Sequence, residues 1–134
     1  MPLEYRSEAL LRRLAELHRD APEVRGSAII THDGLVIASY PPGWDADIHD
    51  PTGGENVAAM AAVVAGLAEQ TMTRLAQGEL ERVLMEGQRG TVGVIPATAD
   101  SALALLIAKD ARLGLVMQAA RQTAGQIRAI LDNR

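Results

Sequence analysis

Residues 57–68 contain no polar side chain, and this apolar stretch limits the possible folds of the chain more than any other segment. It consists mostly of alanine, with valine, methionine, leucine and one glycine, a composition that favours a helix. A helix that is hydrophobic all round must be covered on more than one side. The stretch is shorter than the roughly twenty apolar residues of a membrane span. We therefore expect a buried helix in a soluble domain without a membrane span.

The 134 residues match one domain, which we expect to cover residues 1–134 with its core at about 24–131. Aromatic residues make up only 2% of the chain, so aliphatic side chains must build that core. Leucines at helical spacing predict an amphipathic N-terminal helix over about residues 3–20. This first segment alternates charges and does not resemble an export signal. The absence of cysteine excludes thiol nucleophiles, zinc knuckles, iron-sulfur clusters and disulfides.

Two β-rich runs follow, at residues 24–31 and 35–40, joined through Asp33-Gly34. This pattern predicts a hairpin with a primed turn, in which glycine accommodates the positive φ. Residues 41–54 are rich in proline, glycine and aspartate and predict a long loop. The spacing of Thr52 and Glu55 predicts a capping box, followed by a helix that ends near Gln77 before a glycine.

The remaining chain predicts three strands, at residues 80–86, 91–95 and 102–108, and a final helix over about 112–131. Short turns at 87–90 and 97–100 connect the strands. The first strand alternates charged and apolar residues, as an edge strand does, and the last is apolar throughout, as a central strand is. The expected order is α-ββ-α-βββ-α. This order indicates an α+β sandwich of two or three layers with a five-stranded antiparallel sheet.

Such a sheet can cover only one side of the apolar helix. We expect its larger side chains to form the stripe on the sheet: Val57, Met60, Val64, Leu67 and Leu75. On the other side, Ala58, Ala62 and Gly66 stand four residues apart and would let a second helix approach closely. Leaving an apolar face in water would forfeit several kcal/mol, at about 25 cal/mol per Å². A two-fold partner is therefore favoured over the alternative of an exposed alanine-rich helix.

The order of these segments resembles the Roadblock/dynein light chain family. Four segments carry the resemblance: 24–39, 55–69, 78–87 and 103–131. The resemblance implies a profilin-like fold and a homodimer in which second helices pack together and edge strands join into one sheet. It also implies a platform function, since bacterial members bind Ras-like small GTPases and eukaryotic members belong to dynein and to lysosomal scaffolds.

Carried over by position, the family's dimer interface falls on eight residues of this chain. They are Ala58, Ala62, Ala65, Gly66, Glu69, Leu80, Arg82 and Leu84. The loop at 41–54 matches no motif of the family. Its Trp44 could anchor a partner or fold back over the sheet, and the sequence leaves both possibilities open.

Three patterns could carry chemistry, and each has a simpler interpretation. The acidic loop could gather a divalent metal, but its spacing fits no calcium-loop pattern and favours solvated side chains; its candidate ligands are Asp45, Asp47, His49 and Asp50. Three serines and three histidines allow a triad on paper, but no nucleophile-elbow sequence surrounds any of the serines; these residues are Ser27, Ser39, Ser101, His18, His32 and His49. Gly53-Gly54 could open an anion site at a helix N-terminus, although capping explains the pair more simply.

We therefore expect no enzyme activity, no metal and no cofactor. The formal net charge of -4 disfavours nucleic acid as a partner. The resulting hypothesis is a cytoplasmic homodimer that binds a Ras-like small GTPase and modulates its nucleotide state or localisation. The alternatives are an adaptor subunit of a larger complex without a GTPase, and a small-molecule sensor that uses the 41–54 loop.

Overall fold

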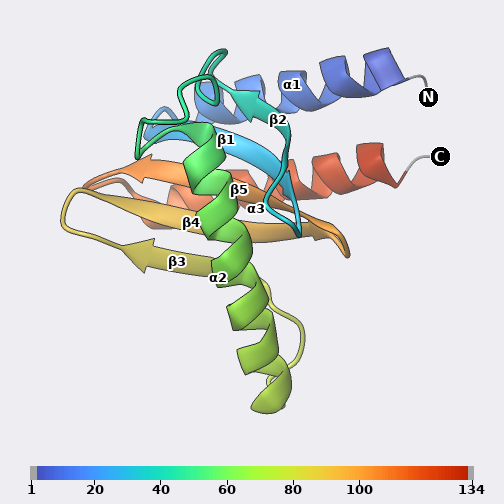
Figure 1. Ribbon diagram of the computed structural model, residues 1–134, viewed down its shortest axis with the longest axis vertical. Helices are drawn as coiled ribbons and strands as arrows, with labels where there is room; N and C mark the ends of the chain where they lie inside the picture. Colours follow the sequence, from blue (N-terminus) through green and yellow to red (C-terminus); the bar gives the residue numbers. More distant parts are fainter. Residues whose placement is uncertain (1–2, 133–134) are drawn as a thin grey trace.

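The computed structural model describes residues 3–132, which form three helices and five strands in the predicted order. The elements are α1 (Leu3–Asp20), β1 (Val24–Thr31), β2 (Val36–Tyr40), α2 (Gly54–Arg74), β3 (Val83–Glu86), β4 (Gly90–Thr98), β5 (Ser101–Ala108) and α3 (Leu113–Leu131). The five strands form one sheet in the order β2-β1-β5-β4-β3, and every neighbouring pair is antiparallel (Figure 1). The apolar strand β5 lies at the centre and β3 at an edge, as predicted.

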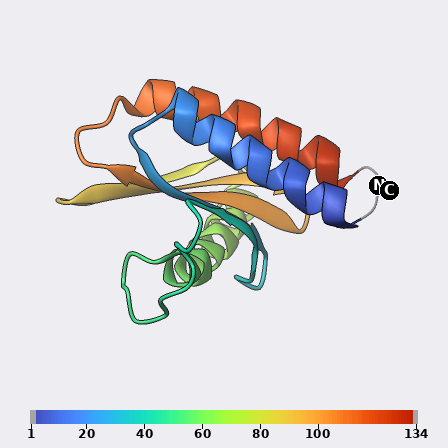
Figure 2. The same cartoon turned by 90° about the horizontal axis from the view of Figure 1, so that it is seen from above.

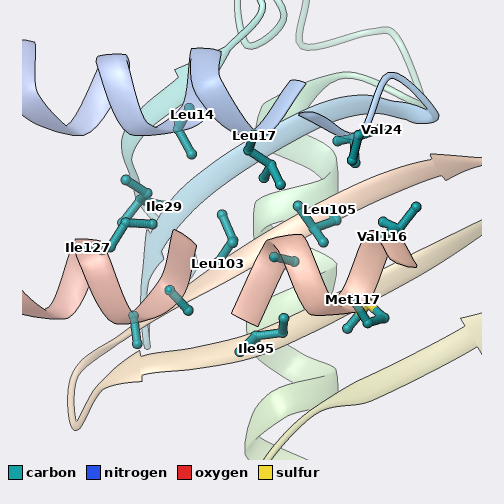
Figure 3. Packing of buried hydrophobic residues seen from close by; sticks show 14 of the residues in the cluster. Leu14, Leu17, Val24, Ile29, Ile95, Leu103, Leu105, Val116, Met117 and Ile127 are labelled. Atoms are coloured by element: carbon teal, nitrogen blue, oxygen red, sulfur yellow. The ribbon is translucent and has the colours of Figure 1, made fainter. Parts of the chain in front are cut away.

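Helices cover both faces of the sheet. α1 and α3 lie side by side on one face, while α2 and the loop before it lie on the other (Figures 1 and 2). The core beneath α1 and α3 contains large aliphatic side chains, among them the fully buried Leu14, Leu103 and Ile127 (Figure 3). The core beneath α2 is smaller and includes Ala28, Ala58, Ala61 and Ala104. The fold is thus a three-layer α+β sandwich.

The β1–β2 turn differs in type from the prediction. Gly34 has a φ of +86°, and Asp33 is not among the residues with positive φ. The Gly34 N–H donates to the Thr31 carbonyl at 2.9 Å, and the Thr31 N–H donates to the Leu35 carbonyl at 2.9 Å. This pattern belongs to a three-residue loop that ends in a glycine bulge, because a primed turn of this sequence would need a positive φ before the glycine as well.

Both ends of α2 are capped in ways that the sequence did not predict. The N-cap is Gly53, and Thr52 instead donates its hydroxyl to the Asp50 carboxylate at 2.8 Å, so the predicted capping box does not form. The helix ends at Arg74, before the predicted end at Gln77. Ala76, with a φ of +55°, takes the left-handed position that glycine usually fills. The N–H groups of residues 76 and 77 donate to the carbonyls of residues 73 and 72, which completes a Schellman motif.

The edge strand β3 is shorter than predicted and begins at Val83, opposite Val94. Leu80 and Arg82, which the prediction placed in this strand, lie in the connection that follows α2. β4 is longer than predicted and continues through Pro96 to Thr98, which pairs with Ser101. Proline lacks the N–H of a strand residue, but it is tolerated where a strand has an open side, and beyond Val94 no described strand flanks β4 on the β3 side.

Candidate interaction surface

Three large apolar side chains of α2 are exposed and share one side of the helix. Met60 is 57% exposed, Val63 64% and Leu67 65%. Their spacing of three and four residues places them on one helical face, which points away from the sheet. We call these three residues the α2 outer face. They are the largest group of exposed aliphatic side chains on one described helix.

The small residues of α2 face the sheet instead. Ala58 and Ala61 are fully buried, and Ala62 and Ala65 pack against the same core. The helix also lies against the β1–β2 turn, where a Cβ on Gly34 would come within 3.1 Å of the Ala59 Cα. The prediction that Met60, Leu67 and Leu75 face the sheet was therefore wrong. The prediction was right for Val57, which is buried in the core beneath α2. Near the turn, such close approach of backbone to backbone leaves room only for small side chains.

The residues predicted for a dimer interface separate into two groups. Ala58 is fully buried by the protein's own sheet, and Ala62 and Ala65 are partly buried there. The remaining five belong to the far half of α2 and to the chain around β3: Gly66, Glu69, Leu80, Arg82 and Leu84. Of these, only Leu80 is half-buried and the other four are exposed. The outer face itself was not predicted, although positions 60, 63 and 67 already share one side of a helix.

The second half of α2 extends beyond β3, the last strand of the sheet (Figure 1). Leu84 and Met85 of this edge strand are 37% and 39% exposed. α2 contacts β3, so the overhanging helix and the open strand belong to one continuous side of the molecule. This side presents both apolar side chains and a strand edge.

Trp44 folds back onto the protein, which is one of the two possibilities that the sequence left open. Its indole lies over Gly26 and Gly54, and a Cβ on Gly26 would overlap the ring. The indole N–H donates to the Thr52 carbonyl at 2.8 Å. Trp44 is half-buried against the core beneath α2 and therefore fixes the loop rather than standing free.

The polar groups of the 41–54 loop bond within the loop. The Asp47 carboxylate accepts the His49 N–H at 2.9 Å, and the Asp50 carboxylate accepts the Thr52 N–H at 2.9 Å. The backbone and hydroxyl of Thr52 lower the pKa of Asp50. The N–H groups of Gly53 and Gly54 donate to loop carbonyls, which removes them from an anion site. Among the side chains that the structure describes, no three histidine or carboxylate groups lie close enough to hold a metal ion.

One serine–histidine pair does form, between His18 on α1 and Ser27 on β1. The His18 Nε2 lies 2.8 Å from the Ser27 Oγ, and the imidazole packs against the Tyr40 ring with centroids 4.6 Å apart. Burial lowers the pKa of His18 to about 4, while a hydrogen bond with the Val24 backbone acts in the opposite direction. Ser27 is fully buried, so its hydroxyl cannot reach a substrate. The pair therefore joins α1 to the sheet.

None of the helices in the described part of the chain combines the length and hydropathy needed to cross a bilayer.

Most of the chain matches the model of one known protein family. Residues 10–107 match the Roadblock/LC7 domain. The chain belongs to this family. The resemblance stated from the sequence is thereby confirmed.

Proteins similar to this Roadblock/LC7 chain include a relative in sequence and several solved structures of the same fold. The uncharacterised protein MJ0310 of Methanocaldococcus jannaschii is 33% identical over 120 residues, which cover 89% of this chain and 96% of the relative. The gliding protein MglB of Thermus thermophilus has a TM-score of 0.82 at 20% identity, with 96% and 93% of the two chains covered. Profilin II of Acanthamoeba castellanii has a TM-score of 0.59 at 15% identity, with 92% and 96% covered. These structures support the profilin-like fold.

Proposed function

We propose that this Roadblock/LC7 protein is a cytoplasmic, non-enzymatic homodimer that regulates a Ras-like small GTPase. The α2 outer face is the observation that carries the proposal. Its three large side chains are each more than half exposed and share one side of a single helix. Covering such side chains gains about 1 to 2 kcal/mol each. A second copy of the chain offers the same apolar face in return, as an isologous two-fold contact requires.

The geometry around β3 suits the same dimer. The strand has an open edge, and an antiparallel partner strand from a second copy would pair its free N–H and C=O groups. Gly66 offers no side chain on the overhanging half of α2, where a built Cβ would meet no atom within 4 Å. Glu69 and Leu84 lie exposed on the same side. We therefore place the interface at the α2 outer face and the β3 edge, with Ala58 behind it.

The regulatory role rests on the family and on how this chain uses its polar groups. The described polar clusters bond within the fold, as in the 41–54 loop and the pair of His18 and Ser27. A regulator acts without its own reactive groups when it orients the switch segments of a GTPase that carries the nucleotide. A two-fold platform formed by two copies of α2 would supply a broad surface for that contact.

The dimer is tested by charge substitution on the outer face. Leu67→Glu should place an unpaired carboxylate in an apolar seam and convert the dimer to monomer, as measured by sedimentation at micromolar concentration. Gln122→Glu adds the same charge on an exposed position of α3 and should leave the dimer intact. Wild-type protein that sediments as a monomer would overturn the proposed dimer.

The GTPase is tested by binding to the small GTPase encoded nearest to this gene, loaded with GDP or a GTP analogue. The proposal expects a preference for one nucleotide state, lost in the Leu67→Glu variant. If the GTPase binds in neither nucleotide state, the proposed GTPase-regulating role would be overturned, whereas the proposed dimer would not. That result would favour the alternative of an adaptor subunit.

A further inference from the structure

A groove of about 620 Å³ lies at the edge of the sheet, beyond the point where β3 begins. At residues 95–98, β4 pairs with β5 on one side, and no strand of the described chain pairs with it on the other. α3 lines one wall, while the overhanging half of α2 and residues 78–82 line the other. α2 and α3 lie on opposite faces of the sheet (Figure 2). The groove thus occupies the place of a short strand that the chain does not supply.

The two walls carry opposite charges. α3 contributes Arg121 and Arg128, whereas α2 and the segment after it contribute Glu69, Glu79 and Glu81. Within residues 3–132, neither Arg121 nor any of the three glutamates forms an ion pair. Arg128 makes a 3.5 Å contact with an exposed carboxylate one turn further along α3. The walls therefore offer unpaired positive charge on one side and unpaired negative charge on the other.

An extended chain that lies along a sheet edge points successive side chains to opposite faces. We propose that this groove binds an extended peptide of alternating charge, with acidic side chains toward α3 and basic side chains toward α2. Pro96 lacks an N–H and limits backbone pairing at this edge, so the side-chain charges carry most of the selectivity. Arg82, just before β3, also lines the groove, so the acidic wall includes one positive charge.

The lining favours a peptide over a small molecule. Small-molecule sites are mostly apolar with few polar groups, whereas charged side chains line both walls here. Met117 and Ala97 give the groove an apolar floor against which a peptide backbone can lie. The groove is formed within one copy of the chain, and the proposal does not depend on the GTPase. Glu69 of the groove also lies beside the proposed dimer interface, so the peptide and a second copy would be neighbours there.

Two end-blocked octapeptides of identical composition test the proposal. One alternates glutamate with lysine, and the other carries four glutamates followed by four lysines. In an NMR titration of the full chain, the alternating peptide should bind at least about fivefold more tightly, because only its charges can match both walls along the groove. It should shift the amide signals of Gly78, Ala97 and Gly125. Equal affinity of the two peptides, or shifts confined to the α2 outer face, would overturn the proposal.

Matched charge reversals locate the site. Arg121→Glu should weaken binding of the alternating peptide about threefold or more, whereas Arg12→Glu, on an exposed position of α1, should change it by less than about twofold. Equal effects of the two variants would contradict the assignment to this groove. Shifts at the same amides that grow with protein concentration alone would show that a second copy occupies the groove, and would also overturn the peptide proposal.

Discussion

The two faces of the sheet are covered by side chains of different size. Beneath α1 and α3, large aliphatic side chains from both helices and the sheet bury one another completely (Figure 3). Beneath α2, alanines and Val57 lie against the sheet, whereas Met60, Val63 and Leu67 point away. One face is completed within a single chain, whereas on the other the large apolar side chains of the α2 outer face stay exposed. A small domain can therefore keep large apolar side chains exposed on one helix while its own core stays buried.

The largest expected effect comes from the completed face. Leu103→Ala removes a fully buried side chain between the sheet and the two helices. It should lower the free energy of unfolding by about 3 kcal/mol, because a cavity remains in a well-packed core. Urea denaturation measures this loss. A loss below about 1 kcal/mol would mean that this core is packed more loosely than the structure shows.

The core beneath α2 should be sensitive to added volume. Ala58→Leu inserts three carbon atoms between helix and sheet and should cost about 2 kcal/mol of unfolding free energy. Gly66→Ala adds a methyl group at an open helical position and should stabilise the monomer by up to about 1 kcal/mol. Both are measured by urea denaturation at concentrations where the chain is monomeric. A neutral Ala58→Leu would indicate that α2 moves freely on the sheet.

The α1 face should also respond to acid through His18. Because its pKa is about 4 in the folded protein, below the ordinary value of 6.5 that it regains on unfolding, protonation favours the unfolded chain. This contribution to stability is complete above pH 6.5 and is lost as the pH falls toward 4. The expected loss is about 1 to 2 kcal/mol, allowing for solvent screening of a half-buried ring.

The His18→Gln variant should lack this pH dependence, while His32→Gln, at an exposed position, should keep it. Glu23 and Asp50 have lowered pKa values, so their stabilisation is lost only at more acid pH, below about 4.5. Denaturation curves between about pH 7 and pH 5 therefore isolate His18. Identical curves for the wild type and for His18→Gln in that range would contradict a lowered pKa.

The smallest expected effect belongs to the α2 outer face. Val63→Ser should change the unfolding free energy of the monomer by less than about 0.5 kcal/mol, because the side chain is 64% exposed. The same substitution should weaken the proposed dimer, which dilution series in the ultracentrifuge would detect. A large loss of monomer stability would mean that Val63 belongs to the folded core, and the contrast between the two faces would fail.

Much of this fold could be predicted from the sequence because it follows from local patterns. The element order, the central β5 and the amphipathic α1 come from hydrophobic periodicity and turn residues, which act over a few positions. The start of β3 was predicted three residues too early, because residues 80–82 mix apolar and charged side chains as an edge strand can. Their conformation depends on where α2 ends. The helix ends at a left-handed cap formed by Ala76, and because glycine is the usual residue there, an alanine gives no sign of this cap in the sequence.

The sequence by itself determined that this chain has an apolar helix that one sheet cannot cover, because residues 57–68 leave it no polar side. Only the tertiary structure decided which side of that helix faces outward. α2 approaches the turn at Gly34 too closely for large side chains there. Ala58 and Ala61, together with Val57, fill the space beneath the helix, and Met60, Val63 and Leu67 are turned away. Helical spacing fixes which residues share a face, but the distance between packed backbones decides which face is buried.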